Sequence, residues 1–236
     1  MTAMRKDVRA LATQPSAEEK EVILPCACEE EFYVEDLGQV ETKPLYAFFK
    51  RAFDIVFSLI FMVLLALPML IIAVCVKCSS EGTVLYHQER LGLGGKKIDV
   101  IKFRSMRMDA EQDAIRWSMG DDDPRITKVG RFLRKTRLDE LPQLWCILKG
   151  DMSVVGPRPE REAYYQRFEQ YVHGFSERLK VQPGLTGLAQ VRGGYYLMPQ
   201  EKILYDVEYI KSRSLWLDIK IVFETVAVVF KREGAK

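Results

Sequence analysis

Two adjacent carboxylates, Asp139 and Glu140, are the residues in this sequence best suited to chemistry. They stand at the start of a helix expected over 139–149, with Pro142 in its first turn and Gly150 at its end. Free N–H groups and the helix dipole at such a position favour the ionised carboxylate. An acidic pair there is often only a helix cap. Among arginines, however, an ionised carboxylate can also attack phosphorus or hold a magnesium ion.

A dense run of positive charge precedes this acidic pair. Such a run is typical of a solvated face, and beside a membrane it attracts anionic lipid. Nucleic acid is a poor alternative and we expect no such partner, because the run lacks interleaved aromatic residues and abuts two carboxylates. Three of its members share one predicted helical face that leads directly to the acidic pair, namely Arg131, Arg134 and Lys135.

Arg158 stands between two prolines in the run Gly156-Pro157-Arg158-Pro159. Prolines fix the backbone, so less conformational entropy is lost when this side chain is presented to an anion. The planar guanidinium group suits a phosphate. The acidic pair and Arg158 together indicate chemistry at a phosphate group.

Residues 52–76 form an apolar run of 25 residues with one charge, Asp54. As a straight helix it would measure about 37 Å, enough to cross a hydrocarbon core of roughly 30 Å. Basic residues flank both ends, and the positive-inside rule places both flanks in the cytoplasm, which a single crossing does not allow. Pro68 removes a helical hydrogen bond and forces a kink or break. We therefore expect a re-entrant helix broken at Pro68, with a kinked spanning helix as the alternative.

Apolar residues also dominate 214–230, where three charged residues interrupt them and basic residues flank them. This pattern predicts an amphipathic interfacial helix held by apolar area and basic anchors, and a buried core helix is the competing interpretation. The chain thus divides into an acidic, flexible segment over 1–45, a re-entrant membrane helix over 46–79, a main body over 80–213, and an interfacial helix with a tail over 214–236.

The main body is expected to be a helix-rich α+β domain. Residues 83–89 and 97–103 alternate as two strands of a small hairpin around a glycine-rich turn. Besides 139–149, helices are expected over 106–118, 160–180 and 200–213. The glycine cluster lacks the third glycine of a dinucleotide-binding fingerprint, and no Walker sequence is present.

Composition excludes a polycationic DNA-binding protein, since 35 basic and 33 acidic residues leave a formal charge of +2. The charge is uneven: residues 1–44 hold ten acidic and five basic residues, so they carry −5 and the remainder carries +7. Five cysteines and the absence of a secretory signal indicate a reducing compartment without a disulfide framework. Within the acidic segment, the alternation of Phe32, Val34 and Leu37 predicts a short ordered piece.

The run from 123 to 160, DPRITKVGRFLRKTRLDELPQLWCILKGDMSVVGPRPE, resembles the signature of the bacterial sugar transferase family. These are polyprenyl-phosphate hexose-1-phosphate transferases, also called monotopic phosphoglycosyl transferases. Other pieces match the family in order, namely KRAFDIVFSLI, HQERLGLGGK, IKFRSM, QPGLTGLAQV and LYDVEYI. The resemblance covers about residues 46–232 and makes 80–213 the catalytic domain.

The resemblance implies transfer of sugar-1-phosphate from a UDP-sugar to undecaprenyl phosphate, with loss of UMP, at the cytoplasmic face of the bacterial inner membrane. It implies that Asp139 is the nucleophile and forms a covalent phosphosugar intermediate, that Glu140 supports it, and that Mg²⁺ binds at Asp139. Further residues of the site by resemblance are Lys102, Arg134, Arg158 and Asp206. The pathway is expected to build an exopolysaccharide, a capsule or a lipopolysaccharide. The transferred sugar and a homodimer stay open.

Two alternatives belong to other classes. A conventional glycosyltransferase would hold magnesium with Asp121, Asp122 and Asp123 and release UDP, although three aspartates before a proline are more often a solvated turn. A non-enzymatic membrane scaffold would use the basic face to bind lipid or a partner. The combined roles of the site residues favour the phosphoglycosyl transferase.

Overall fold

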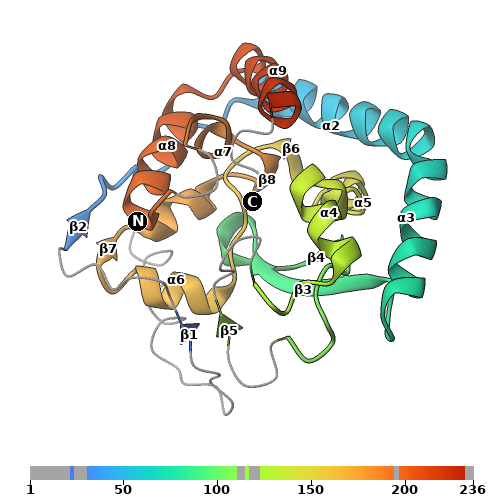
Figure 1. The fold of residues 1–236 in the computed structure, drawn as a ribbon. Helices are drawn as coiled ribbons and strands as arrows, with labels where there is room; N and C mark the ends of the chain where they lie inside the picture. The colour runs from blue at the N-terminus through green and yellow to red at the C-terminus, as the bar shows by residue number, and fades with distance from the viewer. Residues whose placement is uncertain (1–21, 24–30, 111–114, 117–122, 194–196, 232–236) are drawn as a thin grey trace.

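The computed structural model describes residues 22–23, 31–110, 115–116, 123–193 and 197–231 of the 236-residue chain. Within these residues helices predominate and the strands pair two by two, so the prediction of a helix-rich α+β fold is confirmed (Figure 1). Three of the strand pairs are parallel: β1 (Val22–Ile23) with β5 (Ile115–Arg116), β2 (Phe32–Tyr33) with β7 (Val172–His173), and β6 (Ser153–Val155) with β8 (Gly184–Thr186).

The fourth pair is the predicted hairpin, formed by antiparallel strands β3 (Leu85–Leu91) and β4 (Lys97–Phe103). The short 3-10 helix η1 (Leu93–Gly95) turns the chain between them, with Gly94 in the left-handed region at φ 66°. Ile98 and Val100 of β4 are buried. Because side chains alternate along a strand, Lys102 points to the same, inner face of the hairpin.

The predicted re-entrant helix is a bent pair, α2 (Pro44–Leu64) and α3 (Ala66–Ser79), whose axes differ by 64°. The break falls at Leu65, three residues before the predicted position. Pro68 explains this shift, because it has no N–H to donate to the carbonyl of Leu64, four residues earlier. Pro68 itself lies in the first turn of α3, where a missing N–H costs little.

Among the described residues, no single helix is long and apolar enough to cross a bilayer, whereas α2 and α3 together satisfy that criterion as a bent pair. Figure 1 shows α2 running past α5 and α3 turning down beside α4. The inner face of α3 packs Ile72 and Val76 against Phe103 of β4 and Leu133 of α4 (Lys128–Thr136). The bent pair therefore encloses the elements around the acidic pair.

The helix expected over 139–149 is divided in two. A 3-10 turn, η3 (Leu138–Glu140), contains the acidic pair, and α5 (Gln143–Lys149) follows with Pro142 at its N-cap. The division follows from Pro142, which cannot donate a hydrogen bond back to Leu138. Gly150 ends α5 in the left-handed conformation at φ 92°, as predicted.

Arg137 joins α4 to η3 and has the one positive φ, 57°, among the described non-glycine residues. Its N–H donates to the carbonyl of Arg134, which closes the last turn of α4. The left-handed conformation reverses the chain within one residue, so that Asp139 and Glu140 fold back toward β4. An L-residue held there stores strain next to the acidic pair.

The prediction of a long helix over 160–180 is wrong. That stretch contains α6 (Glu162–Phe168), β7 and the 3-10 helix η4 (Phe175–Lys180). Strand β2 draws Val172–His173 into a parallel pair, and Gly174 at φ 96° reverses the chain after it. Phe32 and Val34 pack against the core cluster that contains Val172 of β7, so the short ordered piece that their alternation predicted is present. Tertiary pairing overrides the helical pattern here.

The prediction of a helix over 106–118 is also wrong for its described residues, 106–110 and 115–116. Met106 forms an isolated antiparallel bridge with Ile126, and the N–H of Arg107 donates to the carbonyl of Arg125. Strand β5 occupies 115–116. Residues 111–114 and 117–118 lie outside the described part of the chain.

The C-terminal part contains α7 (Leu188–Arg192), α8 (Pro199–Ser212) and α9 (Leu215–Lys231), so helices over 200–213 and 214–230 are confirmed. Helix α9 buries Asp218 and Ile221 and exposes Trp216 and Phe223. It therefore has one face against the body and one apolar face exposed. The largest core cluster joins it to the hairpin, α5 and β6.

Gly130 permits the contact between α4 and the segment after β4. A Cβ atom at this position would lie 1.9 Å from the carbonyl oxygen of Ser105. We expect Gly130→Ala to lower the free energy of unfolding by about 1–3 kcal/mol, because overpacking outweighs the gain in helix propensity. Chemical denaturation measures this change. Lys135→Ala on the exposed side of α4 is the control, and equal stability of both variants would contradict the close contact.

Strain at Arg137 predicts a difference between two variants that both lack the side chain. We expect Arg137→Gly to be more stable than Arg137→Ala by about 1 kcal/mol, since only glycine adopts the left-handed conformation without strain. Urea unfolding of the two purified variants measures the difference. An alanine variant as stable as the glycine variant would show that the turn is unstrained.

Candidate active site

The acidic pair lies in the turn η3, with cations on several sides. Asp139 is buried, with 9% of its surface exposed, and the side chain of Glu140 is 14% exposed. Strand β4 packs against η3 and brings Lys102 to the pair, while Arg158 approaches from the loop between β6 and α6. The structure thus brings together four of the residues that the sequence predicted for one site: Asp139, Glu140, Lys102 and Arg158.

Glu140 is held by a bidentate pair with Arg158. Nη1 of Arg158 donates to Oε2 of Glu140 at 3.2 Å, and Nη2 donates to Oε1. The ammonium group of Lys102 lies 3.8 Å from Oε1 of Glu140. Burial opposes the charged form, but Arg158 and Lys102 overcome it and hold the pKa of Glu140 well below its usual range. Glu140 is therefore a carboxylate fixed in place and ionised.

Asp139 differs from its neighbour, since no described residue donates a hydrogen bond to its carboxylate. Burial and the adjacent charge of Glu140 raise the pKa of Asp139, against the opposing effect of Lys102, Arg134 and Arg158. One carboxylate of the pair is thus bound by cations, and the other is available to a ligand.

Two cations lie on the inner face of the hairpin. Burial, together with the positive charges of Arg90 and Arg158, lowers the pKa of Lys102 to about 7. Arg90 is the residue that sequence reasoning missed: it pairs across the hairpin with Ile98, so it shares the inner face with Lys102. It donates to the carbonyl of Pro159. Its position in the motif HQERLGLGGK was the available signal.

Arg134 lies on α4, as the basic pattern predicted, and its charge acts on the carboxyl group of Asp139. Arg131 and Lys135 of the same helix are exposed. The predicted basic face therefore divides into one half-buried residue near the acidic pair and others that face outward.

Asp206 is connected to the acidic pair only indirectly, through Arg178 and the backbone of Arg158. It is 2% exposed on α8, and its Oδ2 lies 2.8 Å from Nη2 of Arg178, which is equally buried. The same Nη2 donates to the backbone carbonyl of Arg158 at 2.8 Å. The structure therefore connects Asp206 to the site through Arg178 and not by direct contact with Glu140.

The side chains near Asp139 determine whether Mg²⁺ can bind at this site. The described residues contain no group of three carboxylate, histidine or cysteine side chains that could hold a metal. Mg²⁺ is commonly bound by one or two carboxylates together with substrate phosphates and water. The unbound carboxylate of Asp139 fits that mode, with a phosphorylated ligand completing the coordination.

The alternative magnesium site, Asp121 to Asp123, is described only at its last residue. Asp123 is buried and forms an ion pair with Arg125 at 2.6 Å. It also accepts a hydrogen bond from the N–H of Arg125, which makes it part of a local turn. Asp121 and Asp122 lie outside the described residues.

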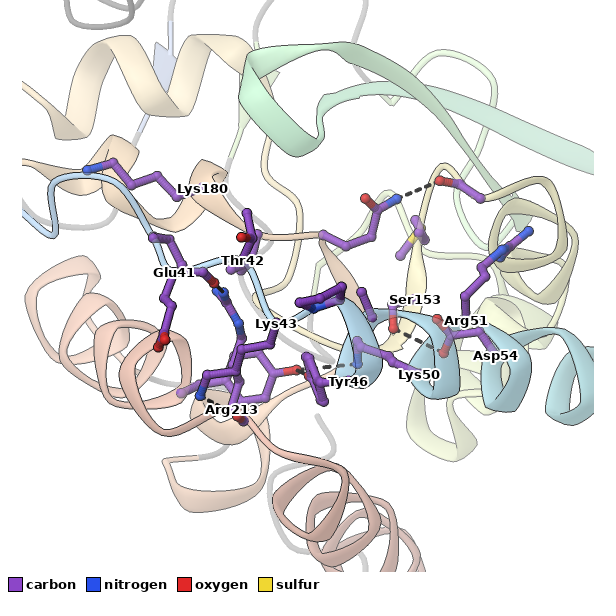
Figure 2. A pocket seen from close by; sticks show the side chains of 18 residues that line it. Glu41, Thr42, Lys43, Tyr46, Lys50, Arg51, Asp54, Ser153, Lys180 and Arg213 are labelled. Carbon is purple, nitrogen blue, oxygen red and sulfur yellow. Dashed lines mark hydrogen bonds between the residues drawn. The ribbon is translucent and has the colours of Figure 1, made fainter. Parts of the chain in front are cut away.

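A cavity of about 420 Å³ lies away from the acidic pair, where residues 40–43, the start of α2 and α8 meet (Figure 2). Six of its charged side chains already have partners within the protein, namely Lys43, Lys50, Arg51, Asp54, Lys180 and Arg213. Lys50 pairs with Asp218 at 3.0 Å, and Figure 2 shows Ser153 bonded to Asp54. These contacts join α2 to α9 and β6.

The geometry around the acidic pair suits an anionic ligand that carries phosphate. Cations outnumber carboxylates, and they are half-buried, so their fields are less screened than at an exposed surface. An unbound carboxylate in the same place can attack phosphorus or bind a metal that also binds phosphate oxygens. Such an arrangement is suited to phosphoryl transfer.

Comparison with known proteins agrees with this chemistry. A family model described as bacterial sugar transferase matches residues 45–232. A UDP-N-acetylgalactosamine-undecaprenyl-phosphate N-acetylgalactosaminephosphotransferase of Aeromonas hydrophila is 41% identical over 203 residues, which cover 85% of this chain and 48% of that protein. A UDP-glucose:undecaprenyl-phosphate glucose-1-phosphate transferase of Escherichia coli K12 is 41% identical over 215 residues, 86% of this chain and 46% of that protein.

A third relative, a UDP-glucose:undecaprenyl-phosphate glucose-1-phosphate transferase of Caulobacter vibrioides, is 39% identical over 192 residues, 79% of this chain and 71% of that protein. The chain spans about half the length of the Aeromonas and Escherichia relatives. The family match includes the acidic pair, the hairpin and the loop that carries Arg158. This chain belongs to the bacterial sugar transferase family.

Proposed function

We propose that this chain transfers sugar-1-phosphate from a UDP-sugar to undecaprenyl phosphate and releases UMP, as the first membrane step in the synthesis of a polysaccharide or glycoconjugate. The observation that carries the proposal is the contrast within the acidic pair. Asp139 has a carboxylate that no described residue binds, while Glu140 beside it is fixed by Arg158. The names of the relatives supply the classes of donor and acceptor.

The proposed reaction has two steps at one phosphorus atom. An oxygen of the Asp139 carboxylate forms a bond to the β-phosphorus of the UDP-sugar, the bond from that phosphorus to the bridging oxygen breaks, and UMP leaves with that oxygen. A phosphate oxygen of undecaprenyl phosphate then forms a bond to the same phosphorus, and the bond to Asp139 breaks. The carboxylate is regenerated, and two bulky substrates use one site in turn.

The cations stabilise the negative charge that both substrates bring. Arg158 is held against Glu140 by a bidentate contact, and its planar guanidinium group suits a phosphate. Lys102 and Arg134 act on Asp139 itself. When bound, Mg²⁺ would offset charge on the phosphate oxygens, with Asp139 as its protein ligand.

The proposed location is the cytoplasmic face of the bacterial inner membrane. Helices α2, α3 and α9 expose large apolar side chains, which favours burial in lipid over exposure to water. Basic residues at the ends of the apolar segments favour contact with anionic head groups. The exposed apolar residues include Phe48, Val63 and Leu64 of α2, Leu67 and Leu70 of α3, and Trp216 and Phe223 of α9.

The reaction is tested by nucleotide release from purified protein in detergent with undecaprenyl phosphate, magnesium and a panel of UDP-sugars. We expect UMP release beyond one equivalent of enzyme to require the acceptor, which regenerates the Asp139 carboxylate. We expect Asp139→Asn to lower the rate of UMP release more than about a thousandfold because the nucleophile is lost. Asp99→Asn is the matched control, since Asp99 is a half-exposed carboxylate of β4 paired with His87.

Three other outcomes would contradict the proposal. Release of UDP would indicate a conventional glycosyltransferase and direct attention to Asp121–Asp123. Full activity of Asp139→Asn would show that Asp139 is not the nucleophile. A folded protein that binds lipid but releases nucleotide from no donor would favour the membrane scaffold.

The pKa of Lys102 predicts the alkaline side of the pH profile. Lys102 loses its charge as the pH rises through about 7, so we expect kcat/KM for the donor to fall above that pH. The fall in kcat should occur at higher pH than the fall in kcat/KM, because bound phosphate stabilises the ammonium form of Lys102. Initial rates of UMP release between pH 5.5 and pH 9.5, a range of about four units, measure both profiles.

Lys102→Arg provides the control for this assignment, because arginine stays protonated throughout the range. The alkaline limb in kcat/KM should move upward or disappear in this variant, whatever its absolute rate. A limb that stays at the same pH would assign the titration to another group.

A further inference from the structure

The loop Gly156–Pro159, here called the Arg158 loop, has an unusual need for hydrogen-bond donors. Two of its four residues are prolines, which have no N–H, so the loop cannot form a regular ladder with its neighbours. Its carbonyl groups nevertheless lie in the interior, where an unpaired carbonyl is costly. Pro157 accepts from the N–H of Gly184 at 2.9 Å, and Pro159 accepts from Arg90.

The carbonyl of Arg158 itself is bound by Arg178. Nη2 of Arg178 donates to this oxygen at 2.8 Å. The guanidinium group lies 4.8 Å from the ring centre of Phe175 and 5.9 Å from that of Tyr165. Arg178 is 2% exposed, so its position is set by packing and by its polar contacts alone.

Asp206 supplies the negative charge that such a buried guanidinium requires. Its Oδ2 lies 2.8 Å from the same Nη2 that binds Arg158. Removing one partner of a buried ion pair leaves an uncompensated charge and displaces the other partner. Asp206 therefore determines where Arg178 lies, and Arg178 determines where the backbone of Arg158 lies.

We propose that Arg178 is a positioning residue, which fixes the backbone of Arg158 so that its guanidinium stays on Glu140 and faces the reacting phosphate, and that Asp206 acts through Arg178. The kinetic part of this inference rests on the proposed function. Its structural part, the order of the Arg158 loop, does not depend on the reaction.

Buried contacts favour this assignment over direct binding of substrate by Asp206. Both side chains of the ion pair are almost fully enclosed, at 1% and 2% exposure, so neither faces a ligand. A carboxylate would also repel a diphosphate. Misplacing a catalytic group by about 1 Å lowers the rate by about a hundredfold, so a loop held from behind has a large effect on the reaction.

Three variants test the inference. Arg178→Met removes the donor and the charge at similar length, and Arg178→Lys keeps the charge opposite Asp206. Arg104→Met is the matched control, because Arg104 is a buried arginine that donates to the carbonyls of Glu81 and Ser80 after α3, away from the Arg158 loop.

The first measurement is hydrogen–deuterium exchange of the purified proteins in detergent, which needs no substrate. Arg178→Met should speed exchange in peptides covering residues 154–162 by about tenfold, because the loop opens locally. Arg104→Met should leave these peptides unchanged. If Arg178→Met does not fold, the same comparison is made with Arg178→Lys, with a smaller expected change. Unchanged exchange in a folded Arg178 variant would overturn the inference.

The second measurement is steady-state UMP release. Arg178→Met should lower kcat by about a hundredfold and change the donor KM by less than about threefold, with Arg178→Lys about tenfold more active than Arg178→Met. Arg104→Met should keep kcat within about twofold of the unmodified chain, per folded molecule. An equal loss in the Arg104 variant would show a general effect of lost stability and overturn the positioning role.

A double-mutant cycle tests that Arg178 acts through Arg158. In a protein that already contains Arg158→Lys, adding Arg178→Met should lower kcat by less than about threefold, whereas independent roles would multiply the two losses. Multiplied losses would overturn the inference. If the unmodified chain releases no UMP from any donor, the proposed function fails, and the exchange experiment alone decides whether Arg178 orders the loop.

Discussion

The half-buried pair between Glu140 and Arg158 is the constraint on which the rest of this structure depends. A carboxylate at 14% exposure is stable in its charged form only if cations meet it with good geometry. Lys102 from the hairpin and Arg158 from the loop after β6 meet this requirement. The turn η3, the hairpin and the Arg158 loop must therefore converge, and the surrounding helices hold them in that arrangement.

Helix α2 is part of that frame and not only an anchor. Its one buried acid, Asp54, accepts the N–H of Val154 at 2.9 Å and the hydroxyl of Ser153 at 3.0 Å. Lys50, one turn earlier, donates to the carbonyl of Val155 at 2.9 Å and pairs with Asp218 of α9. The polar side of α2 thus fixes β6, the strand that leads into the Arg158 loop. The single charge within the apolar run, near its start, therefore has a structural cause.

Sequence patterns correctly predicted the elements whose structure depends on neighbouring residues in the chain. Alternation predicted the hairpin, and Gly150 and Pro142 marked the limits of α5. The expectation over 160–180 was wrong because β7 pairs with β2, which lies about 140 residues earlier in the chain and leaves no trace in the local pattern. The acidic pair and Arg158 were visible in the sequence as charges among helix and proline signals. The burial of Asp206 behind Arg178 was not, because a contact between α8 and η4 follows from packing.

Two adjacent carboxylates take different roles here because their surroundings differ, and the same cations act on both. Arg158 and Lys102 stabilise the charge of Glu140, and burial together with that charge raises the pKa of Asp139. A carboxylate that is neither bound nor strongly stabilised retains more nucleophilic character than one held by a guanidinium. The relatives named for glucose and for N-acetylgalactosamine are each 41% identical to this chain. Under the proposed function, a phosphate-binding arrangement of this kind would contact the diphosphate that nucleotide-sugar donors share, so the choice of sugar would depend on residues outside it.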